Sequence, residues 1–330
     1  MKRRKSMKKI MTAVTVFASC MLPLCALDNL HFGILGNVYA PGIDGYFGAS
    51  GLKMSEMVFR DSSGGDLISN IEWDIGYQVS AGVGLSVGPA DRFNRIGVSL
   101  GGMFLWFFPV NNRNMKDTDW DDSGNVYSYG ESMVSTLSGM QAEGGIAVNF
   151  PIRHKYLLEI TTDVWYSRYA AIAHDGWTGW AGSDKKTAFY GAAVEYIQEW
   201  IIAAPGIGLR RKFNKTHCGI KASVSPFIWG CHVDNHYFRT FENGDPDLKY
   251  MRFTDNTTKG IFFRIQGDWF WNITSRVQMG ITLNYLAVNN SRGDTSVSSA
   301  GLAEYSFVEK GMAGAAVKTF GLDLSIRTTL

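Results

Sequence analysis

Alternation of apolar and polar residues is the main pattern along this chain. It is clearest at the end, where Phe320, Leu322, Leu324, Ile326, Thr328 and Leu330 fall on one side of the backbone, and Thr319, Gly321, Asp323, Ser325, Arg327 and Thr329 fall on the other. Successive side chains of a strand point to opposite faces, so a period of two predicts strands. The same alternation recurs at 158–165, 261–272 and 277–285. The pattern therefore predicts an all-β fold with long strands.

The connections between these strands alternate between short and long. Short polar turns are predicted at 88–94, 149–155, 212–217 and 272–276. Longer stretches rich in Gly, Asp, Ser and Asn are predicted as loops at 61–66, 111–132, 174–186, 232–259 and 289–299. Five long loops and four short turns separate ten strands. An even number of strands puts both termini on one side and all the long loops on the other.

Alternation alone fits either a soluble β-sandwich or a membrane barrel. Glu159, Asp163, Arg264 and Asp268 lie in the middle of predicted strands, where a barrel lumen can pair their charges. Aromatic residues gather near strand ends, as in 104–108 and 269–271, which is typical of the girdles of membrane barrels but also of ordinary core packing. The strands are also long for a sandwich. These features favour a ten-stranded antiparallel transmembrane β-barrel.

The first residues predict export. A basic stretch at 2–9 precedes an apolar run at 10–24 and small residues around Ala26, which is the pattern of a secretory signal peptide. We therefore predict a signal peptide at 1–26 and one outer-membrane β-barrel domain at 27–330. A loose match to a lipoprotein cleavage motif ends at Cys20 and gives an alternative cleavage site.

Composition narrows the function classes. The formal net charge of the 330 residues is +2, which gives no reason to expect nucleic acid as a partner. No segment after 26 has the roughly 18 uncharged apolar residues that a membrane helix needs. Cys218 and Cys231 are predicted to be free thiols on one extended strand, too far apart for a disulfide.

Two acidic segments on the same predicted rim carry candidate chemistry. Asp117 and Asp119 follow the third strand, and Asp234 and His236 follow the seventh. In a ten-stranded barrel these strands lie across the mouth from each other. A carboxylate beside a histidine orients the ring and stabilises its protonated form, so that it can take a proton from water. Two close carboxylates can share a proton and polarise a carbonyl group.

The acidic and histidine residues of these two segments also have simpler interpretations. Asp121 and Asp122 fit a solvated loop. His232 and His236 have the spacing of a chance metal pair, but a lone pair of histidines in a loop is a poor zinc site, so we predict no metal and no cofactor.

The chain resembles the omptin family of outer-membrane proteases, ten-stranded barrels with an active site at the outer mouth. Omptins carry an Asp-x-Asp-Trp segment and an Asp-x-His segment, which match 117–120 and 234–236 in order and position. Further similarity lies at 56–59, 71–73, 131–132 and 166–169, and the resemblance spans about 44–330. It implies Asp117, Asp119, Asp234 and His236 as catalytic residues, water as the nucleophile, and extracellular peptides or proteins as substrates.

The resemblance also implies binding residues. Glu56 matches one acid of the pocket for a basic side chain, whereas His232 and Gly130 stand where further acids are expected. We therefore expect a weakened preference for Arg or Lys before the cut. Glu131 and Ser132 are predicted to support substrate binding.

For contact with outer-membrane lipid, Arg168 matches the family's lipid-binding set, but Tyr166 and Val164 depart from it. Two other functions remain open from the sequence. One is a non-proteolytic barrel that acts as an adhesin or host-protein binder, and the other is a small porin.

Overall fold

The computed structural model describes residues 32–34, 37–60, 65–90, 92–111, 113–237, 251–299 and 302–330, so the predicted signal peptide at 1–26 lies outside it. The described residues hold no helix long and apolar enough to cross a membrane. In chain order, the strand segments are β1 (Phe32–Ile34), β2 (Asn37–Phe59), β3 (Leu67–Pro89), β4 (Gly97–Pro109), β5 (Arg113–Trp120), β6 (Val126–Arg153), β7 (Tyr156–Trp180), β8 (Lys186–Lys212), β9 (Thr216–Ser225), β10 (Ile228–His236), β11 (Met251–Asn272), β12 (Val277–Ser299) and β13 (Leu302–Thr329).

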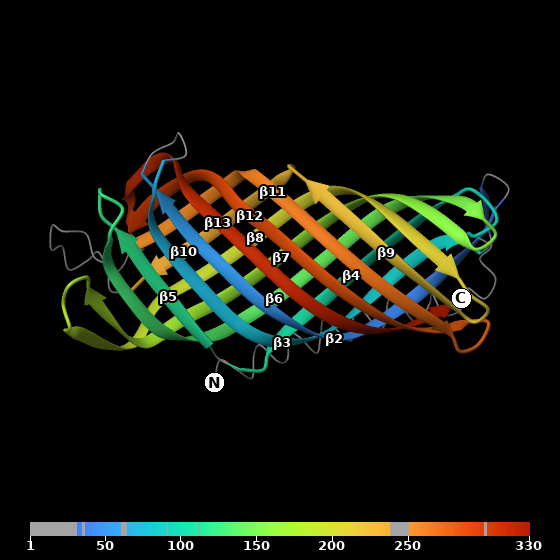
Figure 1. The fold of residues 1–330 in the computed structure, drawn as a ribbon, viewed down its shortest axis with the longest axis horizontal. Helices are drawn as coiled ribbons and strands as arrows, with labels where there is room; N and C mark the ends of the chain where they lie inside the picture. The colour runs from blue at the N-terminus through green and yellow to red at the C-terminus, as the bar shows by residue number, and fades with distance from the viewer. Residues whose placement is uncertain are drawn as a thin grey trace.

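These segments form a closed antiparallel ring of ten barrel strands within the described part of the chain (Figure 1). β4 and β5 share one position, because both lie between β3 and β6. β9 and β10 likewise share the position between β8 and β11. β13 pairs with β2 and closes the ring, whereas the short β1 pairs only with β2. The predicted fold class is confirmed.

The third and seventh barrel strands are both interrupted at a proline. β4 ends at Pro109, and Pro226 separates β9 from β10. Proline has no backbone N–H to give to a ladder, so it interrupts a central strand. At the second break the Ser225 hydroxyl replaces the missing pairing, since it donates to the Ala203 carbonyl and accepts the Phe227 N–H at 2.8 Å. The segments carrying the predicted catalytic residues start directly after these breaks.

The alternation seen in the sequence sorts side chains between the outside and the lumen. Phe320 and Leu324 are 60% and 47% exposed on the outer face, whereas Ser325 is 5% exposed inside. On β11, Ile265 and Trp269 face outward, and Arg264 and Asp268 are buried. Exposed apolar side chains surround the barrel. On β12 and β13 they include Tyr285 and Phe320, which are cross-strand partners. We refer to this band as the apolar belt.

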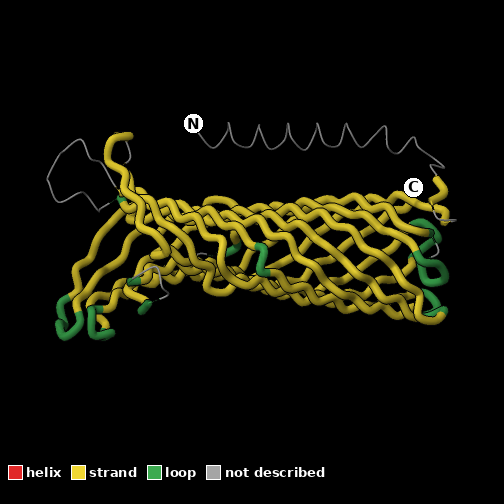
Figure 2. The backbone as a smooth tube through the Cα atoms, turned by 90° about the horizontal axis from the view of Figure 1, so that it is seen from above, coloured by secondary structure: helices red, strands yellow, loops and turns green. Residues whose placement is uncertain are grey.

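The two ends of the barrel differ as predicted, but the long connections are mostly strand. Tight turns close the end that holds the C-terminus, and tall hairpins extend from the other end (Figure 2). β5 and β6 are joined by a turn in which the Asp121 carboxylate accepts the N–H groups of Ser123 and Asn125. β12 continues through the predicted loop at 289–299. These loop predictions were wrong because hairpins standing in water have polar residues on both faces, so that composition does not separate them from loops.

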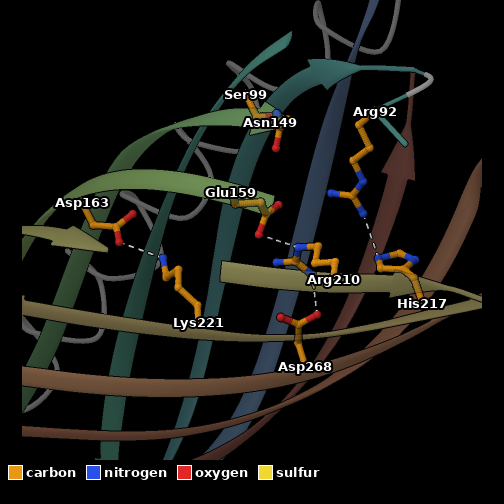
Figure 3. Close-up of polar contacts among 9 residues, drawn as sticks. All are labelled: Arg92, Ser99, Asn149, Glu159, Asp163, Arg210, His217, Lys221 and Asp268. Atoms are coloured by element: carbon orange, nitrogen blue, oxygen red, sulfur yellow. Dashed lines mark hydrogen bonds and ion pairs between the residues drawn. The ribbon is translucent and has the colours of Figure 1, made fainter. Parts of the chain in front are cut away.

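The lumen is filled in two layers. Near the tight turns, ion pairs cross it around a cavity of about 520 Å³: Arg210 contacts both Glu159 and Asp268, and Lys221 contacts Asp163 at 2.8 Å (Figure 3). Toward the hairpins the lumen is apolar. Its largest side chains, all fully buried, are Trp73, Trp165, Trp200, Tyr169, Tyr196 and Phe262. The predicted charged residues therefore fill only the part of the lumen near the tight turns, and apolar side chains fill the rest. A lumen filled in this way gives no support for the porin alternative.

Candidate active site

Asp234 and His236 lie next to each other on the inner face of β10. His236 Nε2 is in hydrogen-bond contact with Asp234 Oδ2, and both residues are buried. A carboxylate only accepts hydrogen bonds, so Nε2 carries the proton and Nδ1 keeps its lone pair. The Phe253 ring of β11 packs edge-on against the imidazole at 5.2 Å and holds its plane. The couple therefore presents Nδ1 as a base.

Asp117 extends the site to the other side of the mouth. It pairs with Ile71 of β3, which in turn pairs with Glu56 of β2, so these three residues form one row on the inner face. Asp119 lies one inward position further along the β5–β6 hairpin, where its carboxylate accepts the Ser128 hydroxyl at 2.6 Å. The structure thus places Asp117 in the same inward-facing row as Glu56, and Asp119 nearer the tip of the hairpin.

Glu56 connects the two sides. The row containing it lies five residues beyond Gly51, the partner of Phe320 in the apolar belt, so the site stands about 15 Å along the strand above that belt. Burial, the charges of Asp234 and Asp255, a hydrogen bond with Asp234 and the charge of Asp117 raise the pKa of Glu56 well above its usual value. The raised pKa favours the neutral, protonated form of Glu56, which can donate toward the Asp234 carboxylate. Ligand atoms of Glu56, Asp234 and His236 lie within 4.8 Å of one another.

Asp255 and His232 lie beside this group of side chains. They are cross-strand partners on β11 and β10, and both are buried. Burial raises the pKa of Asp255 to about 7, opposed by a hydrogen bond from Thr295 and reinforced by Asp234. Burial lowers the pKa of His232 to about 3, so this ring is neutral. We did not predict Asp255 from the sequence, although it falls in alternation with Phe253 and Thr257 and could have been found by that period.

Two further predicted residues lie on opposite faces of β6. Ser132 is buried on the inner face of β6. Glu131 points to the outer face, where Asn114 donates to it at 2.5 Å, so the structure does not bring it next to Asp234 and His236, and its contact with substrate stays a prediction. A one-residue step reverses the face of a strand side chain, and the hairpin register decides which residue is inside.

Comparison with known proteins identifies the family. The sequence profile described as "Omptin family" matches residues 45–329. This chain belongs to the omptin family. No curated protein sequence matches this omptin.

Among solved structures, the outer-membrane protease OmpT from Escherichia coli matches with a TM-score of 0.74 and 17% identity, covering 88% of this chain and 97% of that one. The transport unit of the autotransporter AIDA-I from Escherichia coli covers 92% of this omptin and 93% of its own chain, with 10% identity and a TM-score of 0.34, which is too low to support an argument.

Membership of this family settles the orientation and the broad class of this omptin. It is an outer-membrane β-barrel of a protease family, with the site at the extracellular end. The tall hairpins therefore face out of the cell, and the tight turns face the periplasm. The predicted localisation is confirmed.

The site of this omptin also has the donor types of a cation site. Glu56, Asp234 and His236 are the one such group found within the described residues. Protons compete with a cation for these donors, because the raised pKa of Glu56 favours its protonated form and His236 Nε2 donates to Asp234. A divalent cation would have to displace the Glu56 proton before binding. The absence of a metal requirement stays a prediction.

Proposed function

We propose that this omptin is an endopeptidase that hydrolyses exposed peptide bonds at the extracellular barrel mouth. The observation that carries the proposal is the Asp234–His236 couple facing the row of Asp117 and Glu56 in one cleft above the apolar belt. A binding surface needs no such arrangement, whereas hydrolysis needs a base, its orienting acid and a group that polarises a carbonyl.

The proposed mechanism uses water as the nucleophile. His236 Nδ1 takes a proton from water while Asp234 stabilises the resulting imidazolium. The hydroxide attacks the scissile carbonyl carbon. Asp117, in its protonated form, polarises the carbonyl oxygen. The tetrahedral intermediate collapses as the His236 proton passes to the leaving amine, giving one carboxylate and one amine.

The proposed substrate preference rests on acids beside the Asp234–His236 couple. The raised pKa of Glu56 disfavours its ionised form, whereas the pKa of Asp255 is about 7. A substrate Arg or Lys side chain reaching Asp255 would favour its ionised form and gain a charge-assisted hydrogen bond. Because His232 is neutral, the preference for a basic residue before the cut is weaker than two ionised acids would give.

Arg168 supports a proposed contact with outer-membrane lipid. It is half-buried on the outer face of β7 and donates to Glu199 at 2.8 Å. The pair leaves part of the guanidinium accessible, which suits one phosphate contact rather than a strong site.

A panel of quenched peptides tests the proposal. The refolded protein in detergent is compared with His236→Ala, Asp117→Ala and the control His154→Ala, a change at an exposed periplasmic turn. We expect cleavage by the wild type and the control, and loss in the other two. A wild type that cuts no peptide but binds some of them would replace the protease with the adhesin alternative. Equal rates in all four proteins would contradict the proposed site.

A further inference from the structure

A second hydrogen-bonded relay lies on the outer wall of the barrel, apart from the cleft. Ser135 Oγ lies 2.9 Å from His174 Nε2, and His174 Nδ1 lies 2.8 Å from Asp175 Oδ2. The Asp175 carboxylate only accepts, so Nδ1 carries the proton and Nε2 accepts the Ser135 hydroxyl. A hydroxyl, a base and an orienting carboxylate are thus connected in the order that nucleophilic hydrolysis requires.

The backbone around Asp175 is irregular where it holds this relay. Asp175 has φ 47°, a left-handed conformation that costs a non-glycine residue about 1–3 kcal/mol. The β6–β7 register shifts at the same place, between Ser132 and Met133 on β6. The second oxygen of the Asp175 carboxylate accepts the Gly191 N–H at 2.8 Å, which fixes the side chain. The strained residue is therefore held in position from both sides.

The relay faces away from the lumen. Val134 and Ala173, the neighbours of Ser135 and His174 along the chain, are buried in the core, so Ser135 and His174 point outward. Met133 and Leu137 on the same wall are exposed, at 49% and 51%. The hydroxyl therefore opens toward an apolar environment and not toward the peptide cleft.

The backbone ladder is interrupted next to Ser135. β6 pairs with β4 up to Gly139 and with β5 from Val134 onward, so among the described residues the break after Pro109 leaves 135–138 without a ladder partner on that side. A second register shift on the β7 side, between Thr136 and Ser138, leaves Leu137 out of that ladder as well. Backbone N–H groups that are free of a ladder can stabilise an oxyanion.

We propose that Ser135, His174 and Asp175 form a second hydrolytic site, which cleaves acyl esters of membrane amphiphiles at the outer wall. Ser135 Oγ attacks the ester carbonyl as its proton passes to His174 Nε2. The C–O bond breaks, the His174 proton goes to the departing alcohol, and an acyl-serine remains. Water then gives its proton to His174 and its oxygen to the acyl group. The released acid and alcohol account for ester plus water, and Ser135 regains its proton.

Covalent labelling tests this site without knowledge of its natural substrate. The refolded protein in detergent micelles is treated with an alkyl fluorophosphonate, and the labelled residue is located by peptide mass spectrometry. We expect a label on Ser135 of the wild type and of Asp117→Ala, and none on Ser135→Ala or His174→Gln. Ser138→Ala, which removes a nearby hydroxyl, serves as the matched control and keeps the label.

Ester hydrolysis provides the second measurement. On a p-nitrophenyl acyl ester in mixed micelles, we expect Ser135→Ala and His174→Gln to lose about 100-fold or more in kcat. Peptide cleavage at the mouth and the strand signal in circular dichroism show whether each variant has folded. A missing label on Ser135, or wild-type ester hydrolysis by folded Ser135→Ala, overturns the proposal. Asp117→Ala is expected to lose peptide cleavage but to keep ester hydrolysis. Failure of the peptidase proposal can therefore be told apart from failure of the esterase proposal.

Discussion

His236 Nε2 contacts the Asp234 carboxylate two residues earlier on the same strand, so that Nδ1 is the ring nitrogen left to act on water. The pairing is possible because period two puts both side chains on the inner face of β10. It also explains why both side chains can be buried, since the His236 N–H donates to the charged Asp234 carboxylate.

The substitution Asp234→Asn tests this pairing. The amide that replaces the carboxylate can donate to His236 Nε2, which would move the ring proton to Nδ1 and remove the base. We expect kcat on a matched peptide to fall by about 100-fold to 10,000-fold, with a smaller change in KM. Asp121→Asn, a change in the exposed turn of the β5–β6 hairpin, is the control and keeps its activity. An Asp234→Asn rate close to that of the wild type would contradict the assigned base.

The pH dependence of specificity depends on Asp255. With a pKa of about 7, this carboxyl is mainly neutral at about pH 6 and mainly ionised at about pH 8. The ratio of kcat/KM for a peptide with Arg before the cut to one with Leu is therefore expected to rise over this interval. Asp255→Asn should keep the ratio constant. A wild-type ratio that falls with pH would show that Asp255 does not face the basic side chain.

His232 limits the preference for basic residues. His232→Asp adds an acid beside Asp255, and a charge-assisted hydrogen bond contributes about 1.5–3 kcal/mol, so we expect preference for Arg over Leu to increase about tenfold or more at pH 8. His232→Asn, which adds no charge, is the control. Both variants lose the contact with Trp200 at 4.5 Å, so a shared loss of stability cancels in the comparison. Equal preferences for Arg over Leu in the two variants would show that position 232 does not face the basic side chain of the substrate.

Metal ions are expected to inhibit rather than activate. Activity should be unchanged by EDTA, because the proposed chemistry uses only protein groups and water. Added Zn²⁺ should inhibit by taking the donors of Glu56, Asp234 and His236, more strongly at higher pH where the Glu56 proton is easier to displace. Glu56→Gln removes one ligand and should weaken the inhibition. Loss of activity in EDTA that Zn²⁺ restores would contradict this account.

Period-two alternation made the barrel predictable because it acts on every strand that has lipid on one side. Ile265 against Arg264 and Leu324 against Ser325 both follow it. Above the apolar belt the rule weakens, because water lies outside the wall and the hairpins need no apolar face. The predicted loops at 111–132 and 289–299 are largely strand for this reason.

The candidate site was only partly predictable. Asp117, Asp234 and His236 stand in short motifs that a family resemblance reveals, and the structure puts the Asp234–His236 pair near Glu56, whose row includes Asp117. Period two puts Asp255 on the inner face, but its pairing with His232 and the Ser135–His174–Asp175 relay depend on register between distant strands, which no local pattern contains. The outward direction of Glu131 was not predictable either, because one residue of register reverses the direction of a side chain.

A double-mutant cycle of Asp117→Asn and His236→Gln on one peptide tests the central claim, that the two sides of the mouth act on the same water. Residues that act as a unit give non-additive losses. We predict that each single change lowers kcat/KM by about 100-fold or more and that the double change costs little beyond the larger single loss. Multiplied losses, or a single variant with the wild-type rate, would contradict a shared cleft.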